Sequence, residues 1–185
     1  VGKGGKKMAD ITIFYCRGEK QDSAALLQKA ASRYTGQSGP FAVEKEPHGK
    51  PFFPDHPDLY FSVTHSGGFW MAAFSPQKVG LDLQEKRVTG REKKLSERFF
   101  APLERDWLKG QPDERFFDLW AAKESFVKHS GLGFSAGSFP DFAVADGTGL
   151  LPTVKGLQLR HLPFDPGFSL CLCAEAIDSV RFEKM

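Results

Sequence analysis

Residues 117–128 read FDLWAAKESFVK and combine apolar side chains at helical spacing with charged ones. If this stretch is a helix, Glu124 and Lys128 stand on one face, one turn apart, beside Trp120. The pair can be a local ion pair that stabilises the helix by about 0.3–0.5 kcal/mol. The same carboxylate and ammonium, held against aromatic surface, can instead belong to a binding site. The rest of the chain has to decide between these two interpretations.

The composition indicates a globular protein with a substantial core. A chain of 185 residues buries roughly 70% of its unfolded surface, so it can fold without disulfides or a structural metal. The net charge of +2 gives no general argument for nucleic acid or for membranes as a partner. No segment approaches the ~18 consecutive apolar residues of a membrane span. Eighteen phenylalanines indicate an aromatic core or an aromatic-walled pocket.

The cysteines and the first residues bear on the cellular compartment. Cys16 is alone, and Cys171 and Cys173 are separated by one residue, which fits no zinc-binding pattern. We interpret all three as reduced, apolar strand residues of an intracellular, cytoplasmic protein. Residues 1–9 are rich in glycine and lysine without a signal-peptide-like apolar run, and we expect a disordered leader or an expression remnant there.

The first half of the chain predicts several strands around one helix. Asp22 fits the N-cap of that helix and Gly36 its end. The expected elements are a strand at residues 11–16, a helix at 23–34, an irregular loop at 39–57, a strand at 60–65 that ends in a glycine turn, an apolar run at 69–74 that fits either strand or helix, and a strand at 78–83.

Alternation in the strand at residues 78–83 sets the direction of Asp82. One side of this strand carries Val79, Leu81 and Leu83, and the other carries Gly80, Asp82 and Gln84. We therefore expect Asp82 to leave the sheet on the side away from the core.

The second half begins after a charged junction at residues 85–94. We expect helices at about 91–100 and 113–129, with Gly131 and Gly133 as stop signals, and antiparallel strands at 141–145, 156–160, 168–173 and 179–182. Strands and a helix in each half indicate an α+β fold. The expected division is a leader at residues 1–9, an N-terminal α+β half at 10–88 and a C-terminal α+β half at 89–185.

Several polar side chains could converge on one site. Asp82 and Glu124 would supply two hard oxygen ligands, which suit Mg²⁺ completed by water and substrate phosphates. Lys50, His65 and Lys128 would supply positive charge for a phosphate-bearing ligand. Phosphoryl transfer needs this combination, because its catalysis depends on positioning and on neutralising oxygen charge.

Each of these residues also has a structural interpretation. Lys50 can be an ordinary solvated loop lysine, and His65 follows a core-facing pattern that favours a hydrogen-bonded core histidine. Asp82 is harder to dismiss, because a buried carboxylate needs a partner or a metal.

Four motifs in order resemble a known family. They are Gly-Lys-Pro at 49–51, FSVTHSG at 61–67, VGLDL at 79–83 and WAAKESFVK at 120–128. Each is weak alone, but the ordered set closely resembles the Sfp-type 4'-phosphopantetheinyl transferases over residues 47–182. The resemblance implies a pseudo-dimer of two similar α+β halves. It also implies Mg²⁺-dependent transfer of the phosphopantetheine arm of coenzyme A to a serine of an apo acyl or peptidyl carrier protein, with release of adenosine 3',5'-bisphosphate.

The resemblance also implies roles for individual residues. Asp82 and Glu124 would bind Mg²⁺, and Glu124 is the candidate base for the serine proton. Lys128 and His65 would contact the phosphates, with Thr64 beside them. The adenosine end would be lined by Gly49, Lys50 and Pro51.

This chain departs from the family pattern in two places. Gln84 stands where the family often has a glutamate as third metal ligand, and an amide oxygen brings no charge to the metal. Before residue 47 the chain looks shorter than is usual, so we assign no phosphate-binding residue there.

An active transferase is our leading hypothesis. A non-catalytic coenzyme A or carrier-binding module and a Mg²⁺-dependent phosphohydrolase are the alternatives.

The partners expected from the resemblance are coenzyme A and a carrier protein, with a monomeric transferase. A basic cluster follows the Asp82 strand and fits either a docking edge for an acidic carrier or a solvated linker. Its members are Lys86, Arg87, Arg91, Lys93 and Lys94.

Overall fold

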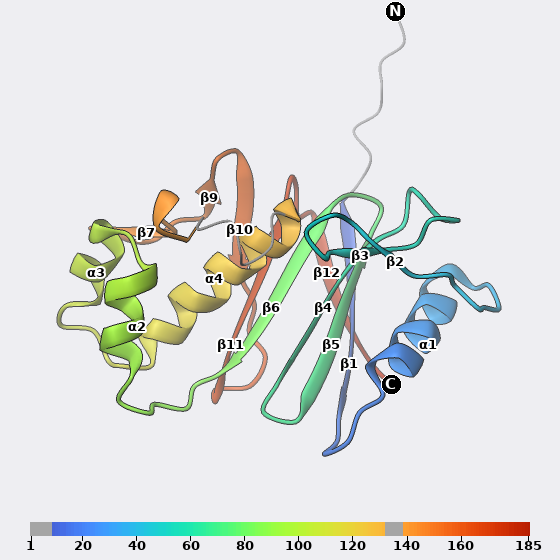
Figure 1. The fold of residues 1–185 in the computed structure, drawn as a ribbon, viewed down its shortest axis with the longest axis horizontal. Coiled ribbons are helices and arrows are strands. Elements are labelled where there is room, and N and C mark those ends of the chain that lie inside the picture. The colour runs from blue at the N-terminus through green and yellow to red at the C-terminus, as the bar shows by residue number, and fades with distance from the viewer. Residues whose placement is uncertain (1–8, 132–138) are drawn as a thin grey trace, which may run out of the picture.

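The computed structural model describes residues 9–131 and 139–185 and contains two four-stranded sheets (Figure 1). The first sheet has the order β12 (Ser179–Lys184), β1 (Asp10–Arg17), β5 (Phe69–Ser75) and β4 (Tyr60–Ser66). The second has the order β6 (Val79–Glu85), β11 (Phe168–Ala174), β10 (Leu157–His161) and β9 (Thr153–Val154). Two short hairpins, β2 (Glu44–Lys45) with β3 (Pro51–Phe52) and β7 (Ala145–Asp146) with β8 (Gly149–Leu150), complete the strands of the described residues.

The helices lie beside these sheets. Figure 1 shows α1 (Ser23–Thr35) next to the first sheet and α4 (Arg115–Ser130) across the second, with α2 (Glu92–Phe99) and α3 (Pro102–Leu108) at the far end. A short 3₁₀ turn, η2 (Phe139–Asp141), follows. The predicted α+β class is confirmed. In the described part of the chain no helix is long and apolar enough to cross a membrane.

Most of the elements predicted from local pattern are present. The Asp22 side chain caps α1 by accepting hydrogen bonds from the amides of Ala24 and Ala25, and Gly36 ends the helix with a left-handed φ of 69°. The apolar run at residues 69–74 is the buried strand β5. Gly131 ends α4 with a φ of 71°, and it follows a helix that begins within two residues of its expected start. Gly133 and residues 1–8 lie outside the described residues.

Other predictions need correction. The strand expected at residues 141–145 is reduced to β7, because residues 139–141 form η2 instead. Helix α3 was not predicted; Pro102 opens its first turn, where the missing amide hydrogen is tolerated. Strand β12 runs parallel to β1 rather than antiparallel, because it returns to the edge of the first sheet.

Each sheet contains a strand that comes from the other expected half of the chain. Strand β6, which precedes the expected boundary at residue 88, pairs with β11 in the second sheet. Strand β12, from the other end of the chain, pairs with β1 in the first. The division into halves at 10–88 and 89–185 therefore stays a prediction, and the sheets themselves do not separate at that residue.

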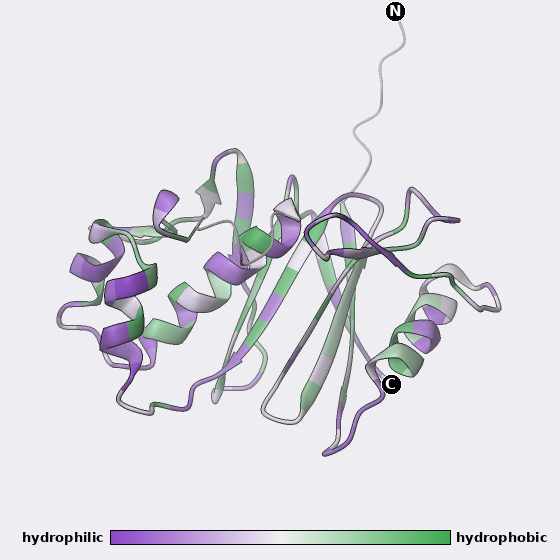
Figure 2. Ribbon diagram, in the orientation of Figure 1, coloured by the Kyte–Doolittle hydropathy of each residue, from purple (hydrophilic) through white to green (hydrophobic). Residues whose placement is uncertain are grey.

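Three buried clusters form the core. One packs α1 on the first sheet, one packs α4 on the second, and a third is shared by strands β1, β5, β6 and β11. Figure 2 shows hydrophobic stretches along the strands and mostly hydrophilic ribbons at α2 and α3. The shared cluster joins the two sheets into one body.

Strand β6 is buried on both faces, so the side of the sheet on which Asp82 lies is also covered. Val79, Leu81 and Leu83 enter the shared cluster, as their alternation predicts. The opposite face lies under α4, and Asp82 is only 3% exposed. A side chain at Gly80 would collide with the backbone of Ser125 and His129, so glycine allows the close approach of helix and strand.

Candidate active site

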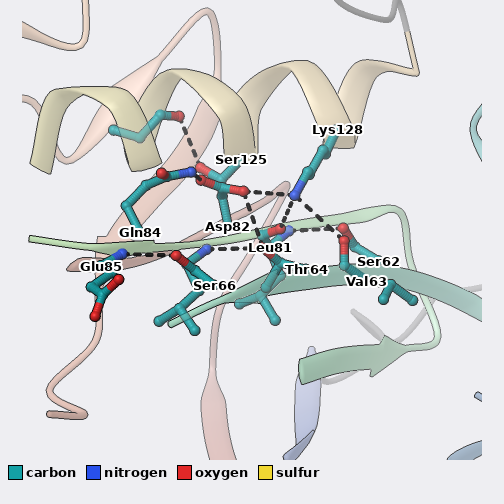
Figure 3. A network of polar contacts seen from close by, with 12 residues as sticks. Ser62, Val63, Thr64, Ser66, Leu81, Asp82, Gln84, Glu85, Ser125 and Lys128 are labelled. Carbon is teal, nitrogen blue, oxygen red and sulfur yellow. Dashed lines mark hydrogen bonds and ion pairs between the residues drawn. The ribbon is translucent and has the colours of Figure 1, made fainter. Parts of the chain in front are cut away.

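The two sheets meet along β4 and β6, which share no backbone ladder in the described part of the chain. Instead, amide groups of β6 donate to side-chain hydroxyl oxygens of β4 at every second residue (Figure 3). The pairs are Leu81 with Ser62, Leu83 with Thr64 and Glu85 with Ser66, at 3.0, 3.1 and 2.9 Å. We call this row of contacts the hydroxyl seam. It satisfies the buried amides of Leu81 and Leu83, which would otherwise need carbonyl partners, whereas the contact of Glu85 is exposed.

Asp82 lies in the hydroxyl seam with both carboxylate oxygens engaged. Its Oδ1 accepts hydrogen bonds from the Thr64 hydroxyl at 3.2 Å and from Lys128 Nζ at 2.6 Å. Its Oδ2 accepts a hydrogen bond from the Gln84 amide nitrogen at 2.7 Å. A buried carboxylate needs such partners, and the ion pair with Lys128 is the strongest kind of contact available to it.

Lys128 reaches down from α4 and spans the hydroxyl seam (Figure 3). Besides Asp82, its Nζ contacts the carbonyl oxygens of Val63 at 3.4 Å and Leu81 at 3.3 Å. Among the described residues, the ion-pair partner of Lys128 is Asp82 and not Glu124. The interpretation of residues 117–128 as a helix with a local ion pair is therefore not supported.

Glu124 lies on α4 one turn before Lys128 and interacts electrostatically with both Asp82 and Lys128. Burial, and then the negative charge of Asp82, raise the pKa of Glu124 to about 7, while Lys128 acts in the opposite direction. A carboxylate whose pKa is raised by a neighbouring carboxylate marks a place where a cation is favoured.

The donor set fits a hard divalent cation. Asp82 and Glu124 offer carboxylate oxygens, and a half-turn of the Gln84 amide would present its oxygen to the same place. Across residues 9–131 and 139–185 there is no cluster of three or more His, Cys, Asp or Glu side chains suited to a metal. A metal held by two carboxylates needs water and substrate oxygens to complete its shell, as Mg²⁺ does in phosphate-transferring sites.

A cleft of about 280 Å³ opens beside Glu124 and Lys128. It is also lined by the loop of Gly49, Lys50 and Pro51 and by residues 61–63 of β4. Three of the four sequence motifs thus contribute to the cleft lining, and the motif at residues 79–83 does not. Lys50 Nζ donates to the carbonyl oxygens of Val79 and His129 at 3.3 and 3.0 Å. Burial lowers the pKa of Lys50 to about 8. Lys50 is thus a partly buried cation at the cleft, not a freely solvated loop lysine.

Four predicted site residues do not line this cleft. Asp82 and Gln84 are connected to it through Lys128, which lines the cleft and pairs with Asp82. His65 is exposed at the end of β4 and does not line the cleft, so it is not a core histidine either. Thr64 is only 4% exposed and also does not line the cleft. Sequence reasoning did not predict the seam role of Ser62, Thr64 and Ser66; the signal was a hydroxyl at every second residue of one strand.

The chain is similar to known proteins over most of its length. Residues 78–173 match the model of the 4'-phosphopantetheinyl transferase superfamily. The 4'-phosphopantetheinyl transferase Sfp of Bacillus subtilis (strain 168) is 32% identical over 176 residues, which cover 86% of this chain and 78% of Sfp. The chain belongs to this superfamily. The transferase is also 32% identical over 157 residues to psf-1 of Bacillus pumilus, with 77% of this chain and 66% of psf-1 covered.

The part of the transferase that matches the superfamily model includes both β6 and α4. Asp82, Gln84, Glu124 and Lys128 therefore lie in the matched region. The β4 residues of the hydroxyl seam and the loop of Lys50 precede it, and only the longer alignments to whole relatives extend over most of the chain.

Proposed function

We infer that this transferase moves the 4'-phosphopantetheine group of coenzyme A to a serine hydroxyl of an apo carrier protein. The serine oxygen bonds to the phosphorus that carries pantetheine, and the bond from that phosphorus to the bridging pyrophosphate oxygen breaks. Adenosine 3',5'-bisphosphate leaves, and the serine proton passes to a base. The observation that supports this proposal is the contact of Asp82 with Lys128, which lines the cleft together with Glu124, in a chain that belongs to this superfamily.

We propose that Asp82 and Glu124 hold Mg²⁺, with Gln84 or a water as a third ligand. When bound, the ion would neutralise the pyrophosphate oxygens and the charge that develops on the leaving group. Lys128 lies next to Asp82, so its ammonium is within reach of a phosphate bound at the same place. Lys50 would supply a second positive charge at the cleft, toward the adenosine end with Gly49 and Pro51.

Glu124 is the candidate base. Without a metal, burial and the neighbouring charge of Asp82 raise its pKa to about 7. A bound cation would oppose this rise, so the assignment as base rests on the position of Glu124 in the cleft lining. The proton would move to Glu124 directly or through one water. His65 stays a proposed phosphate contact. Because it does not line the cleft, binding of coenzyme A or of the carrier would have to bring it closer.

The test is direct transfer. The purified protein is mixed with coenzyme A, Mg²⁺ and each of several apo carrier proteins, and the carriers are analysed by mass spectrometry. We expect a phosphopantetheine adduct on the carrier serine. Asp82→Ala and Glu124→Ala should abolish the adduct while circular dichroism shows an intact fold. A wild-type protein that binds coenzyme A but modifies none of the carriers would contradict the proposal and favour a binding module.

We propose that the transferase acts as a monomer, because the site is built from both sheets of one chain. Sedimentation at assay concentrations would test this. A dimer that dissociates with loss of activity would contradict it.

A further inference from the structure

A second cavity, of about 460 Å³, opens at the first turn of α4. Arg115 and Asp118 line it from α4, Lys86 lines it from the segment after β6, and residues 161–166 line it from the connection between β10 and β11. The cleft described above is lined instead by the C-terminal half of α4 and by Gly131 just beyond it. The two cavities therefore lie toward opposite ends of one helix.

This second cavity is close enough to the proposed reaction centre for one bound protein to cover both. Asp118 precedes Glu124 on α4 by about 9 Å along the helix axis. A protein partner in a stable complex covers about 800 Å² of surface, which corresponds to a patch of roughly 16 Å radius. A carrier that brings its serine to Glu124 can therefore reach the start of α4.

The geometry of the reaction selects the side from which the carrier approaches. The proposed function puts the adenosine end of coenzyme A at the loop of Gly49 and Lys50, next to the end of α4. In phosphoryl transfer the attacking and leaving oxygens lie roughly in line. The leaving oxygen stays with the adenosine bisphosphate, so the serine oxygen has to arrive from the opposite side. That side faces the start of α4 and Lys86.

The α4 side of the cavity offers two cations to an acidic partner. Arg115 Nη1 lies 2.8 Å and Lys86 Nζ 3.7 Å from the carboxylate of Asp118, whose side chain is 8% exposed. The Arg115 side chain is 49% exposed, and its five N–H donors exceed what one carboxylate can use. The other acidic lining residue, Asp165, accepts the Gly167 amide at 2.8 Å in its own turn. A second carboxylate can thus bind the two cations without displacing Asp118.

The facing wall of the cavity is aromatic and already fixed in place. Phe164 is half-buried and packs edge-on against Tyr15 and Phe69, with ring centroids 5.6 and 5.0 Å apart. Phe168 lines the same wall. Arginine and aromatic side chains in a preformed pocket are typical anchors of a protein interface.

We propose that this cavity is a docking site for the carrier protein, with Arg115 and Lys86 binding an acidic side chain of the carrier and Phe164 contacting an apolar one. The proposal rests on the proposed transfer reaction, which requires a carrier beside Glu124. It also divides the basic cluster predicted from the sequence. Lys86 lines the cavity, and the other four members, Arg87, Arg91, Lys93 and Lys94, do not.

Two variants with opposite expected effects test the docking site. Arg115→Glu should raise the KM for the carrier about tenfold, because it repels the acidic side chain. Asp118→Asn should lower that KM about two- to threefold, because it removes the negative charge between the two cations. Lys109→Glu is the matched control. It makes the same change of charge and also breaks an i,i+3 ion pair, but Lys109 lines a different cavity, between α2 and α3.

The first readout is transfer kinetics with a carrier that the wild type modifies, at saturating coenzyme A and Mg²⁺. We expect kcat and the KM for coenzyme A to stay within about twofold of wild type in all three variants, since none of these residues lines the cleft. The effect of Arg115→Glu should shrink at high salt, because the charge is half-exposed. The second readout is calorimetry of carrier binding without coenzyme A, which should give the same order of affinities. If Arg115→Glu does not fold, Arg115→Gln takes its place, with an expected rise in KM of about threefold.

Distinct results would overturn the proposal. An unchanged carrier KM in Arg115→Glu would place docking elsewhere. Equal rises in Arg115→Glu and Lys109→Glu would indicate a general effect of charge or docking between α2 and α3. A raised KM for coenzyme A with an unchanged carrier KM would assign the cavity to coenzyme A. Failure of the proposed function appears separately, as a wild type that binds carriers through Arg115 but transfers nothing; a wild type that neither binds nor modifies any carrier contradicts both.

Discussion

At the scale of single residues, Lys50 has a property that local sequence did not reveal. Its ammonium donates to two carbonyl oxygens, and burial of the side chain lowers its pKa to about 8. A lysine with a lowered pKa is charged below that pH and neutral above it. If Lys50 must be charged to bind a phosphate-bearing ligand, binding should weaken as the pH rises through 8.

We predict that the Kd of coenzyme A rises about eightfold between pH 7.5 and pH 9, because most Lys50 side chains have then lost their proton. Isothermal titration calorimetry without carrier measures this change. Lys50→Arg should remove the pH dependence, since arginine stays charged over this range. A parallel rise of Kd in wild type and Lys50→Arg would contradict the assignment.

Gln84 is the second residue-scale feature, because its amide nitrogen faces Asp82 Oδ2 at 2.7 Å. We predict that Gln84→Glu lowers the melting temperature by several degrees without metal, since a second carboxylate would then face Asp82. With Mg²⁺ the variant should be stabilised more than wild type, because it offers one more charged ligand. Differential scanning calorimetry with and without Mg²⁺ tests both statements. An equal effect of Mg²⁺ on both proteins would place Gln84 outside the metal site.

At the scale of secondary-structure elements, α4 is fixed by a buried ion pair whose two residues do not line the cleft. Lys123 and Glu104 are both fully buried, and Lys123 Nζ lies 2.9 Å from the Glu104 carboxylate. Glu104 also accepts the amides of Ala101 and Val144, each at 2.7 Å. The pair therefore ties α4 to the start of α3 and to the strand region after η2.

We predict that Lys123→Met lowers the free energy of unfolding by about 3–5 kcal/mol, because it leaves the Glu104 charge buried and uncompensated. Urea unfolding measures this loss. The control is Lys109→Met, which breaks an exposed pair with Asp106 and should change stability by less than about 1 kcal/mol. Equal losses in the two variants would show that Glu104 is compensated by its two amide donors alone.

At the scale of the whole molecule, sequence pattern predicted the elements better than their arrangement. Alternation and capping are local, so β1, β6 and the ends of α1 and α4 were predicted correctly. The parallel pairing of β12 with β1 joins the two ends of the chain, and no local pattern encodes it. Motif order indicated Asp82, Glu124 and Lys128 as site residues, but the partner of Lys128 depends on how α4 packs on β6. The hydroxyl seam was not predicted, because it depends on how β4 packs beside β6.

His129 links that packing to the acid stability of the whole fold. It is buried, and among the described residues neither ring nitrogen has a hydrogen-bond partner. Burial, with the positive charges of Lys50 and Lys78, lowers the pKa of His129 from its ordinary value of 6.5 to about 4. In the unfolded chain His129 takes up a proton below pH 6.5, while in the folded protein it stays neutral until about pH 4. Stability is therefore lost as the pH falls through this range.

We predict that this one residue lowers the free energy of unfolding by about 1 kcal/mol between pH 7.5 and pH 5.5. Urea unfolding at both pH values measures the total change, which includes other groups such as Glu124, whose raised pKa acts in the opposite direction. The difference between wild type and His129→Phe isolates the histidine, because the other groups are common to both. His129→Phe should lose less stability on acidification by about that amount. The same loss in both proteins would mean that His129 accepts a proton in the folded state, and that the contact between α4 and β6 is open enough to hydrate it.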